Sequence, residues 1–353
     1  MRKVLVFAYF NKNIGDDLFV KILQDKYKNN YTFLVTSGTD RVQISENFNG
    51  NIEYYSKTME KLDNLLYKKL GYMYFLRKII SKYSDIIIIG GSMFIQYKGW
   101  ENKYKFYQEL INEKTCIIGV NFGPFYDNAF LEKYRSLFEV ASLVSFREKK
   151  SYDFFSQLKN IQYKPDVVFN LYNEKKVNKK NKIIGISVID TSQKENIDEG
   201  KYMRLIENYI KDYNKKGYEV VLFSFCEPEG DLKICMKIKK IYSYVKVISY
   251  TGNNLREFIE EYRKCEKIIA TRFHSMILGW IYGCEVLPLA YSDKTINVIK
   301  DISSYIEYID LRKIKPDSIE NDAFKKLDIR SLKRLRKESE EHFLNIPKLK
   351  RVE

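Results

Sequence analysis

The sequence is poor in histidine and lacks the cysteine patterns of metal sites. It holds two histidines, His274 and His342, among 353 residues, and five cysteines, of which no two are spaced as Cys-x-x-Cys. An odd number of scattered cysteines does not predict a zinc site of the Cys/His type. Because disulfide frameworks are typical of short secreted domains, these cysteines fit a reducing cytoplasm better.

Long apolar runs are also missing. No stretch approaches the roughly 20 apolar residues of a membrane-spanning helix. The N-terminus, MRKVLVFAYFNKN, turns polar without a small-residue cleavage site, so it predicts a first strand and not a signal peptide. With 45% hydrophobic and 30% charged residues, the composition is typical of a globular protein, and the length suits two domains.

The charge balance favours an anionic partner. Lysine and arginine number 61 against 46 acidic residues, which gives a net charge of +15. Nucleic acid, an anionic membrane surface and phosphorylated substrates would all be attracted by this excess. Since no helix-turn-helix, RRM or zinc-finger signature is present, we do not expect a nucleic-acid partner.

Short apolar strands alternate with helical segments, which indicates parallel sheets covered on both faces. The alternation stops at NEKKVNKKNK and restarts after it, so this polar stretch predicts a linker. The predicted fold class is α/β, with two Rossmann-like doubly wound domains facing across a cleft. We expect one domain over residues 1–172, a linker over 173–182, a second domain over 183–316, and charged C-terminal helices over 317–353 that can return to the first domain. The predicted strands are residues 3–9, 85–89, 116–120, 142–146, 183–188, 220–225, 245–249, 267–271 and 285–290.

Glycines and polar residues follow several of these strands. In open α/β sheets, ligands bind beyond the carboxyl ends of the strands, and glycine there lets backbone N–H groups approach a ligand. The alternatives are a tight turn for each glycine, helix-dipole complementarity for Asp16 and Asp17, and a salt bridge on a helix for Glu148. The candidate binding residues of these loops are Gly15, Asp16, Asp17, Gly91, Ser92, Asn121 and Glu148.

His274 is the most informative single residue. It follows the predicted strand 267–271 at the start of a helix, and Arg272 precedes it by two residues. A strand-end arginine and a helix-start imidazole can form an anion clamp with an acid–base group, whereas the alternative is a buried structural histidine. His342 lies in a charged helical tail and is predicted to be a surface residue.

Seven motifs occur in an order that resembles the polysaccharide pyruvyl transferase family over roughly residues 10–300. The resemblance implies a GT-B-like fold and transfer of the pyruvyl group of phosphoenolpyruvate to a sugar, giving a ketal and phosphate. No cofactor is expected, because phosphoenolpyruvate is a substrate. The important arginine, histidine and lysine of the family fall on Arg147, His274 and Lys294. The motifs are NIGDDL (13–18), IIGGSMF (88–94), GVNFGP (119–124), SFREKKS (145–151), KPDVVF (164–169), TRFHSMILGWIYG (271–283) and LAYSDK (289–294).

The chemistry of the substrate agrees with these residues. Phosphoenolpyruvate carries a carboxylate and a phosphate, for which arginine is suited, and a histidine that titrates near neutrality can transfer protons. We therefore predict Arg147, His274 and Lys294 as catalytic, and Arg147, Arg272, Lys294 and Ser275 as donor-binding. The strand-end residues given above become the predicted acceptor site. For Lys294 alone a solvated surface lysine is the alternative, and for the whole chain it is a GT-B-like glycosyltransferase that uses a nucleotide sugar.

Residues 57–83 combine basic with apolar and aromatic side chains. Such a segment predicts a basic helix that can lie on an anionic membrane surface, and the alternative is an amphipathic helix packed on the sheet. The predicted partners are phosphoenolpyruvate and a saccharide acceptor, free or lipid-linked. The predicted location is the cytoplasm, with peripheral contact at the inner membrane face left open.

Overall fold

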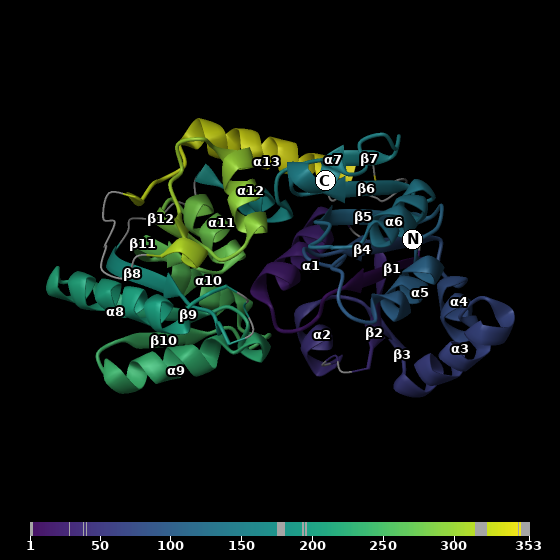
Figure 1. Ribbon diagram of the computed structural model, residues 1–353, viewed down its shortest axis with the longest axis horizontal. Coiled ribbons are helices and arrows are strands. Elements are labelled where there is room, and N and C mark those ends of the chain that lie inside the picture. The colour runs from purple at the N-terminus through teal and green to yellow at the C-terminus, as the bar shows by residue number, and fades with distance from the viewer. Residues whose placement is uncertain are drawn as a thin grey trace. The chain divides into compact units, whose positions relative to one another are not determined.

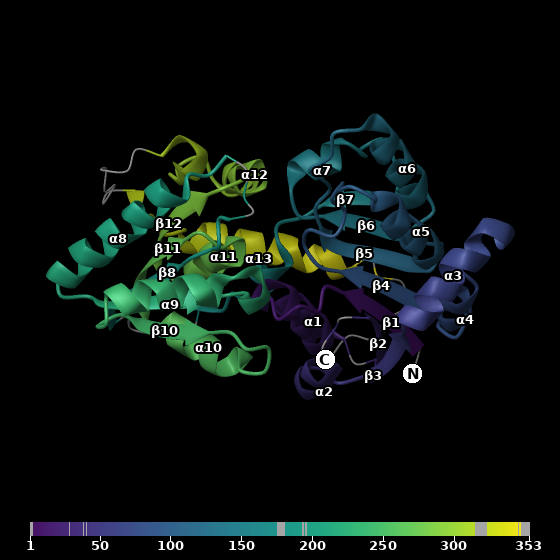
Figure 2. The ribbon, with the colours of Figure 1, turned by 60° about the horizontal axis from the view of Figure 1, so that its bottom comes forward.

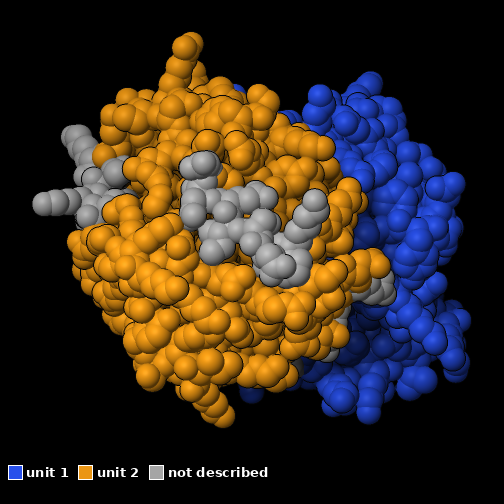
Figure 3. All heavy atoms as spheres, turned by 60° about the vertical axis from the view of Figure 1, so that its left-hand side comes forward, with its two compact units in different colours: residues 1–10, 16–167, 338–353 blue, residues 11–15, 168–337 orange. Residues whose placement is uncertain are grey.

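The computed structural model describes residues 3–27, 29–37, 39, 41–174, 181–192, 194, 196–314, 323–344 and 346. The chain divides into two compact units (Figure 3): unit 1 comprises residues 1–10, 16–167 and 338–353, and unit 2 comprises residues 11–15 and 168–337. The predicted linker, residues 173–182, falls inside unit 2, and its residues 175–180 lie outside the described part of the chain.

Unit 1 contains a seven-stranded sheet, counted over the described residues, with the spatial order β3–β2–β1–β4–β5–β6–β7 (Figure 1). Every neighbouring pair of strands is parallel. The strands are β1 Lys3–Ala8, β2 Asn30–Thr36, β3 Asn51–Tyr55, β4 Asp85–Ile89, β5 Thr115–Val120, β6 Leu143–Phe146 and β7 Ile161–Tyr163. The helices are α1 Ile14–Lys26, whose first two residues belong to unit 2, α2 Arg41–Asn47, α3 Lys57–Leu70, α4 Tyr74–Ile80, α5 Trp100–Leu110, α6 Asn128–Glu139 and α7 Lys149–Asp153.

Unit 2 repeats this architecture with six parallel strands, again counted over the described residues, in the order β10–β9–β8–β11–β12–β13 (Figure 2). The strands are β8 Asn181–Ser187, β9 Glu219–Ser224, β10 Lys246–Ser249, β11 Cys265–Ala270, β12 Glu285–Ala290 and β13 Ile309–Asp310. The helices are α8 Glu199–Lys215, α9 Asp231–Ile241, α10 Leu255–Arg263, α11 Phe273–Ile281 and α12 Asp293–Ile302, and α13 Ile329–Leu344 contributes to both units.

The strand order of each sheet reverses at one position. In unit 1 the chain leaves β1 towards β3 and then restarts on the other side of β1 with β4, and in unit 2 the reversal lies between β8 and β11. Ligands of open α/β sheets bind at such switch points, beyond the carboxyl ends of the strands. The loops that follow β1, β4, β8 and β11 are therefore the places where a site is expected.

The apolar core of each unit lies between its sheet and the covering helices. The core of unit 1 is rich in aromatic rings, with Phe94, Phe122 and Tyr134 among its buried members. That of unit 2 is mainly aliphatic and includes Ile186, Leu222 and Ile269 from three adjacent strands. These buried strands read as continuous apolar runs in the sequence, which is why their positions could be predicted.

The C-terminal helix contradicts one prediction. His342, expected on the surface, is completely buried in unit 1. Its Nδ1 lies 2.7 Å from Ser145 Oγ, and its Nε2 lies 2.8 Å from the carbonyl oxygen of Pro165. Since a carbonyl can only accept, Nε2 donates to Pro165 and Nδ1 accepts from Ser145, whose oxygen accepts in turn from Gln162. The charged residues of α13 hid this buried face in the sequence.

Burial makes His342 a source of acid sensitivity. Desolvation lowers the pKa of His342 to about 4, from an ordinary value of 6.5. Between these values the unfolded chain binds a proton that the folded protein does not, so stability falls as the pH drops from 6.5 to 4. The expected loss is on the order of 3 kcal/mol at the acid end of this window. Chemical denaturation of the full chain at several pH values measures this loss of stability.

The matching variant is His342→Gln, which keeps amide hydrogen bonding but does not titrate. It should be less stable than the parent at pH 7, and the contribution of position 342 to acid sensitivity should disappear. If parent and variant lose the same free energy of unfolding between pH 6.5 and 4, the buried histidine is not its source.

The sequence suggested one helix over residues 57–83, but the structure has two there. It forms α3 and α4, and α3 ends at Gly71, which has a left-handed φ of 73°. The interruption is stabilised by Asp63, a buried carboxylate that accepts from the backbone N–H groups of Phe75 and Leu76 at the start of α4. Among the described residues, no helix is long and apolar enough to cross a membrane.

Candidate active site

At the switch point of unit 1, two strand-end loops are hydrogen-bonded to each other. Asp16 Oδ1, in the first turn of α1, accepts from the backbone N–H of Gly91 after β4 at 3.1 Å. Its neighbour Asp17 is buried and accepts from Gln43 Nε2 at 3.1 Å. Both carboxylates therefore position the protein's own loops, and their place in the first turn of a helix is electrostatically favourable.

Arg147 organises the same edge of the sheet from the end of β6. Its side chain is 2% exposed, and its Nη1 donates to Asp166 Oδ2 at 2.8 Å while Nη2 donates to Asn121 Oδ1 at 2.9 Å. The guanidinium lies against Gly91, where an added Cβ would come within 2.3 Å of Nη2. Glycine at position 91 is therefore needed for the arginine to occupy this place.

Two further predicted residues extend this arrangement. Ser92 Oγ donates to Asn121 Oδ1 at 3.2 Å, so Asn121 joins the loop after β4 to Arg147. Glu148 is buried, and its Oε1 accepts from Ser151 Oγ at 2.6 Å. Gly91, Ser92, Asn121, Arg147 and Glu148 thus come together at the carboxyl ends of β4, β5 and β6, as the sequence predicted for loops of one sheet.

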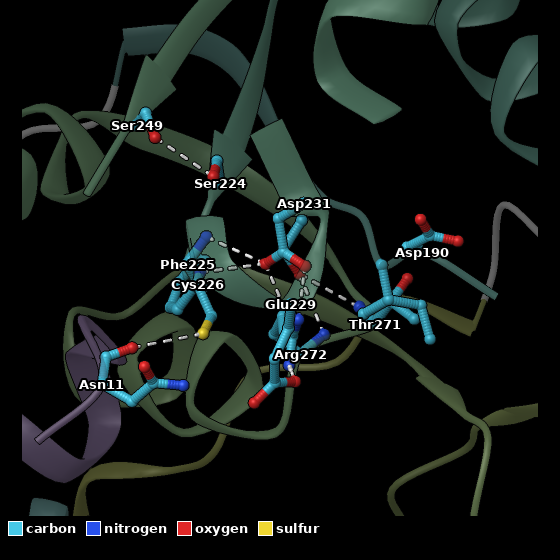
Figure 4. A network of polar contacts seen from close by, with 12 residues as sticks. Asn11, Asp190, Ser224, Phe225, Cys226, Glu229, Asp231, Ser249, Thr271 and Arg272 are labelled. Carbon is cyan, nitrogen blue, oxygen red and sulfur yellow. Dashed lines mark hydrogen bonds and ion pairs between the residues drawn. The ribbon is translucent and has the colours of Figure 1, made fainter. Parts of the chain in front are cut away.

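In unit 2, Arg272 lies in a cluster of carboxylates (Figure 4). Its Nε donates to Asp231 Oδ2 at 2.8 Å, its Nη2 contacts Asp231 Oδ1, and its Nη1 contacts Glu229. Asp231 also accepts from the backbone N–H groups of Phe225 and Cys226 after β9. Burial alone would raise the pKa of Glu229, but the guanidinium more than offsets it and holds that pKa below its ordinary value.

The backbone beside Arg272 is fixed by β8. Ser187 Oγ accepts from the N–H groups of Thr271 and Arg272, at 3.1 and 3.2 Å. Thr271 Oγ1 lies 3.1 Å from the Tyr202 hydroxyl. The segment leading into α11 is thus held by Ser187 at the end of β8 and by Tyr202 of α8.

His274 stands in the first turn of α11 and is 9% exposed. Its ring is nearly perpendicular to that of Phe273, with centroids 5.1 Å apart. The imidazole also lies against the backbone of Gly15, where a Cβ would come within 1.7 Å of Nδ1. Gly15 belongs to unit 2 together with Asn13, which bridges to Cys226, and Ile14, which donates to Phe225 O.

The other predicted donor residues have different surroundings. Lys294 in α12 is half-buried, with Nζ 5.3 Å from the centre of the Phe273 ring, so it neighbours the start of α11. Ser275 is fully buried, and its hydroxyl lies 2.8 Å from that of Tyr262. Arg272 and His274 are two residues apart, and Lys294 approaches Phe273 between them, while the Ser275 side chain contacts α10.

A family model described as polysaccharide pyruvyl transferase matches residues 13–293. The chain belongs to the polysaccharide pyruvyl transferase family. The match confirms the predicted family and includes every predicted site residue except Lys294, which follows directly after it. No curated protein sequence matches this family member.

Similar solved structures agree on the fold. Anabaena Alr3699/HepE in complex with UDP and glucose has a TM-score of 0.53 at 11% identity, covering 98% of this chain and 96% of its own. UDP-GlcNAc 2-epimerase of Methanocaldococcus jannaschii has a TM-score of 0.50 at 11% identity, with coverages of 95% and 98%. MurG of Acinetobacter baumannii has a TM-score of 0.50 at 10% identity, with coverages of 97% and 95%. Two Rossmann-like domains of the GT-B type, as predicted, are thereby confirmed.

Sequence reasoning missed the acidic partners of both arginines in this pyruvyl transferase family member. Asp166 lies in the motif KPDVVF, and Glu229 and Asp231 lie in EPEGD, which begins three residues after the end of β9. The signal was present, because carboxylates beside glycine at the end of an apolar strand resemble the other site loops. The pairing itself depends on the spatial order of the strands, in which β9 and β11 flank β8.

The contact between Gly15 and His274 leads to a prediction. Gly15→Ala should lower turnover roughly tenfold to 100-fold, because the added methyl group must displace the imidazole by an ångström or more. The backbone of Gly15 does not have a positive φ, so alanine is not strained there and the steric contact alone is tested.

Gly200→Ala is the matched control for this prediction. The position lies in α8, where a Cβ would meet only Asp198 Oδ1 at 3.3 Å. Its turnover should equal that of the parent. Unchanged turnover in folded Gly15→Ala would show that the imidazole can move without consequence for the reaction.

Proposed function

We propose that this family member transfers the pyruvyl group of phosphoenolpyruvate to a sugar of a cell-surface polysaccharide or of its lipid-linked precursor. The product is a ketal, and phosphate is released. The family match over residues 13–293, which takes in Arg147, Arg272 and His274, carries the proposal. The free or lipid-linked state of the acceptor belongs to the proposal as well.

The reaction can be written with the residues of unit 2. His274 protonates the enol carbon of phosphoenolpyruvate, and the adjacent carbon becomes an oxocarbenium-like centre. One sugar hydroxyl adds to this centre, the C–O bond to phosphate breaks, and a second hydroxyl closes the ketal. Addition of the two hydroxyls releases two protons. One restores the proton that His274 delivered, and the other goes to the departing phosphate or to water. His274, in the first turn of a helix, is the residue of unit 2 best suited to the proton transfer.

Lys294 is favoured over Arg272 as the cation for the donor in this proposal. Arg272 is paired with Asp231 and Glu229, so this cluster has one positive and two negative charges and a net charge of −1. Such a cluster does not attract a phosphate. We therefore propose that Arg272 positions the segment Thr271–His274, and that Lys294, beside Phe273, is the better candidate for the anionic donor.

Arg147 is proposed in the same way as a positioning residue. Its guanidinium holds Asp166, Asn121 and the backbone of Gly91 together, so its loss would displace the loops after β4 and β5. The acceptor role of Asp16, Gly91, Asn121 and their neighbours remains a proposal, supported by their position beyond the carboxyl ends of the strands.

Incubation with phosphoenolpyruvate and a panel of pyranosides tests the proposed function. Release of inorganic phosphate that depends on an acceptor, with a product heavier by the pyruvyl group in mass spectrometry, is the expected result. The fold is shared with Anabaena Alr3699/HepE, solved with UDP and glucose. Release of UDP from a nucleotide sugar, with no consumption of phosphoenolpyruvate, would replace the proposal with a glycosyltransferase.

We propose a cytoplasmic location for the reaction. All five cysteines are buried and none forms a disulfide. Buried thiols without a bridge are compatible with a reducing compartment, where phosphoenolpyruvate is also available as a substrate.

A further inference from the structure

The outward face of α3 combines lysine with exposed leucine. Lys57, Lys61, Leu65 and Lys68 follow one another at intervals of four, four and three residues, so they share one face of the helix. Leu65 is 64% exposed, and Leu62, beside this face, is 42% exposed. Figures 1 and 2 show α3 alongside α4 in unit 1, and Asp63, on the side of α3 away from Leu65, makes the hydrogen bonds to α4.

Leu62 and Leu65 are not among the side chains packed against the apolar core of unit 1. The one fully buried residue among the 14 of this helix is Asp63, which accepts from the Tyr55 hydroxyl at 2.9 Å as well as from the start of α4. Half-buried Met59 and Tyr67 complete the inward side. A polar anchor with modest apolar contact fixes the helix, so Leu62 and Leu65 are available to a partner.

The lysines of this face keep their charge uncompensated. None of Lys57, Lys61, Lys68 and Lys69 forms an ion pair with a carboxylate in the described part of the chain, and all four are exposed. Glu60 is the single exposed acidic residue of α3. On α4, exposed Lys78 and Tyr74 add a further positive charge and an aromatic ring.

We propose that the α3 face, defined as Lys57, Lys61, Leu62, Leu65, Lys68 and Lys69, binds the surface of an anionic lipid bilayer. A basic helix with apolar side chains between its lysines lies in the membrane interface, where the leucines enter the acyl boundary and the lysines contact the headgroups.

Charge and apolar character together favour lipid over other anions and over self-association. A nucleic-acid backbone would attract the lysines but offers nothing to Leu62 and Leu65. A second copy of this chain, with its net charge of +15, would bring lysines against lysines. The proposal is independent of the transfer chemistry, because it concerns binding of unit 1 to lipid and not the identity of the donor.

Sedimentation of the full chain with vesicles tests the proposal. Vesicles of phosphatidylcholine with about 30% phosphatidylglycerol should bind the protein, and vesicles of phosphatidylcholine alone should bind it far more weakly. Replacing Lys57, Lys61, Lys68 and Lys69 by glutamine should weaken binding to the anionic vesicles by about 600-fold, since each of the four lysines contributes roughly fivefold. Leu62→Ser with Leu65→Ser should weaken it about tenfold.

The matched control removes the same four charges from unit 2. Glutamine at the exposed positions Lys211, Lys233, Lys237 and Lys240 of α8 and α9 should lower vesicle binding far less than the change on α3. An equal loss in both variants would show a general charge effect and overturn the proposal. So would full retention of binding in the leucine variant, or equal recovery of the parent with neutral and anionic vesicles.

Discussion

Replacing His274 with asparagine is expected to lower turnover about 10²–10⁴-fold, the usual contribution of one acid–base group. Asparagine keeps a hydrogen-bonding side chain of similar size but cannot carry the proton that the enol carbon of phosphoenolpyruvate requires. Donor binding should weaken only modestly, because Lys294 and the backbone at the start of α11 remain. Release of phosphate from phosphoenolpyruvate, with and without acceptor, measures the loss.

Two controls separate chemistry from folding in this variant. The unfolding transition of His274→Asn should stay close to that of the parent, since asparagine is smaller than histidine and fits the same space beside Gly15 and Phe273. The affinity for phosphoenolpyruvate should remain close to that of the parent, so that the loss lies in turnover. Near-normal turnover in a folded variant would show that another group moves the proton, with Lys294 or Glu148 as the next candidates.

Much of the sheet architecture could be predicted from the sequence. The bounds of β4 and β12 agree with the predicted strands to the residue, because each is a buried, continuous apolar run. The predictions missed β3, β7 and β13. Most residues of β3 are half-buried, and β7 and β13 are only three and two residues long. Strands near a sheet edge are half-buried, so their apolar pattern is weak. Strand β2, next to the edge strand β3, was missed as well, since polar Thr32 interrupts its apolar run.

The sequence predicted which residues lie at the candidate site, but not which groups their side chains contact. Strand-end loops identified Arg147, Arg272 and His274, because the carboxyl ends of parallel strands meet at one edge. What each side chain touches depends on contacts between distant parts of the chain. Gly15 against His274 and Asp231 beside Arg272 arise from the order of the strands, and the sequence holds no local signal for them.

The Arg272 cluster leads to the largest expected effect on stability. Asp231→Ala should lower the free energy of unfolding by about 3–5 kcal/mol, because it leaves a buried guanidinium without its main counter-charge and frees two backbone N–H groups. Asp293→Asn is the matched control. It breaks an exposed pair with Arg312, for which a loss below about 1 kcal/mol is expected. Urea denaturation of both variants makes the comparison.

A double replacement distinguishes a positioning role of Arg272 from a donor-binding role. Arg272→Met with Asp231→Leu removes both buried charges together, and apolar residues of similar volume commonly restore the stability that a single replacement loses. If Arg272 positions Thr271–His274, the affinity for phosphoenolpyruvate should survive in the double variant, while turnover falls because the start of α11 is less well fixed. If Arg272 instead contacts the donor, the affinity for phosphoenolpyruvate should fall together with turnover, even where stability has recovered. The expected loss of binding free energy is that of one charge-assisted contact, about 1.5–3 kcal/mol. The carboxylates that surround the guanidinium favour the first outcome.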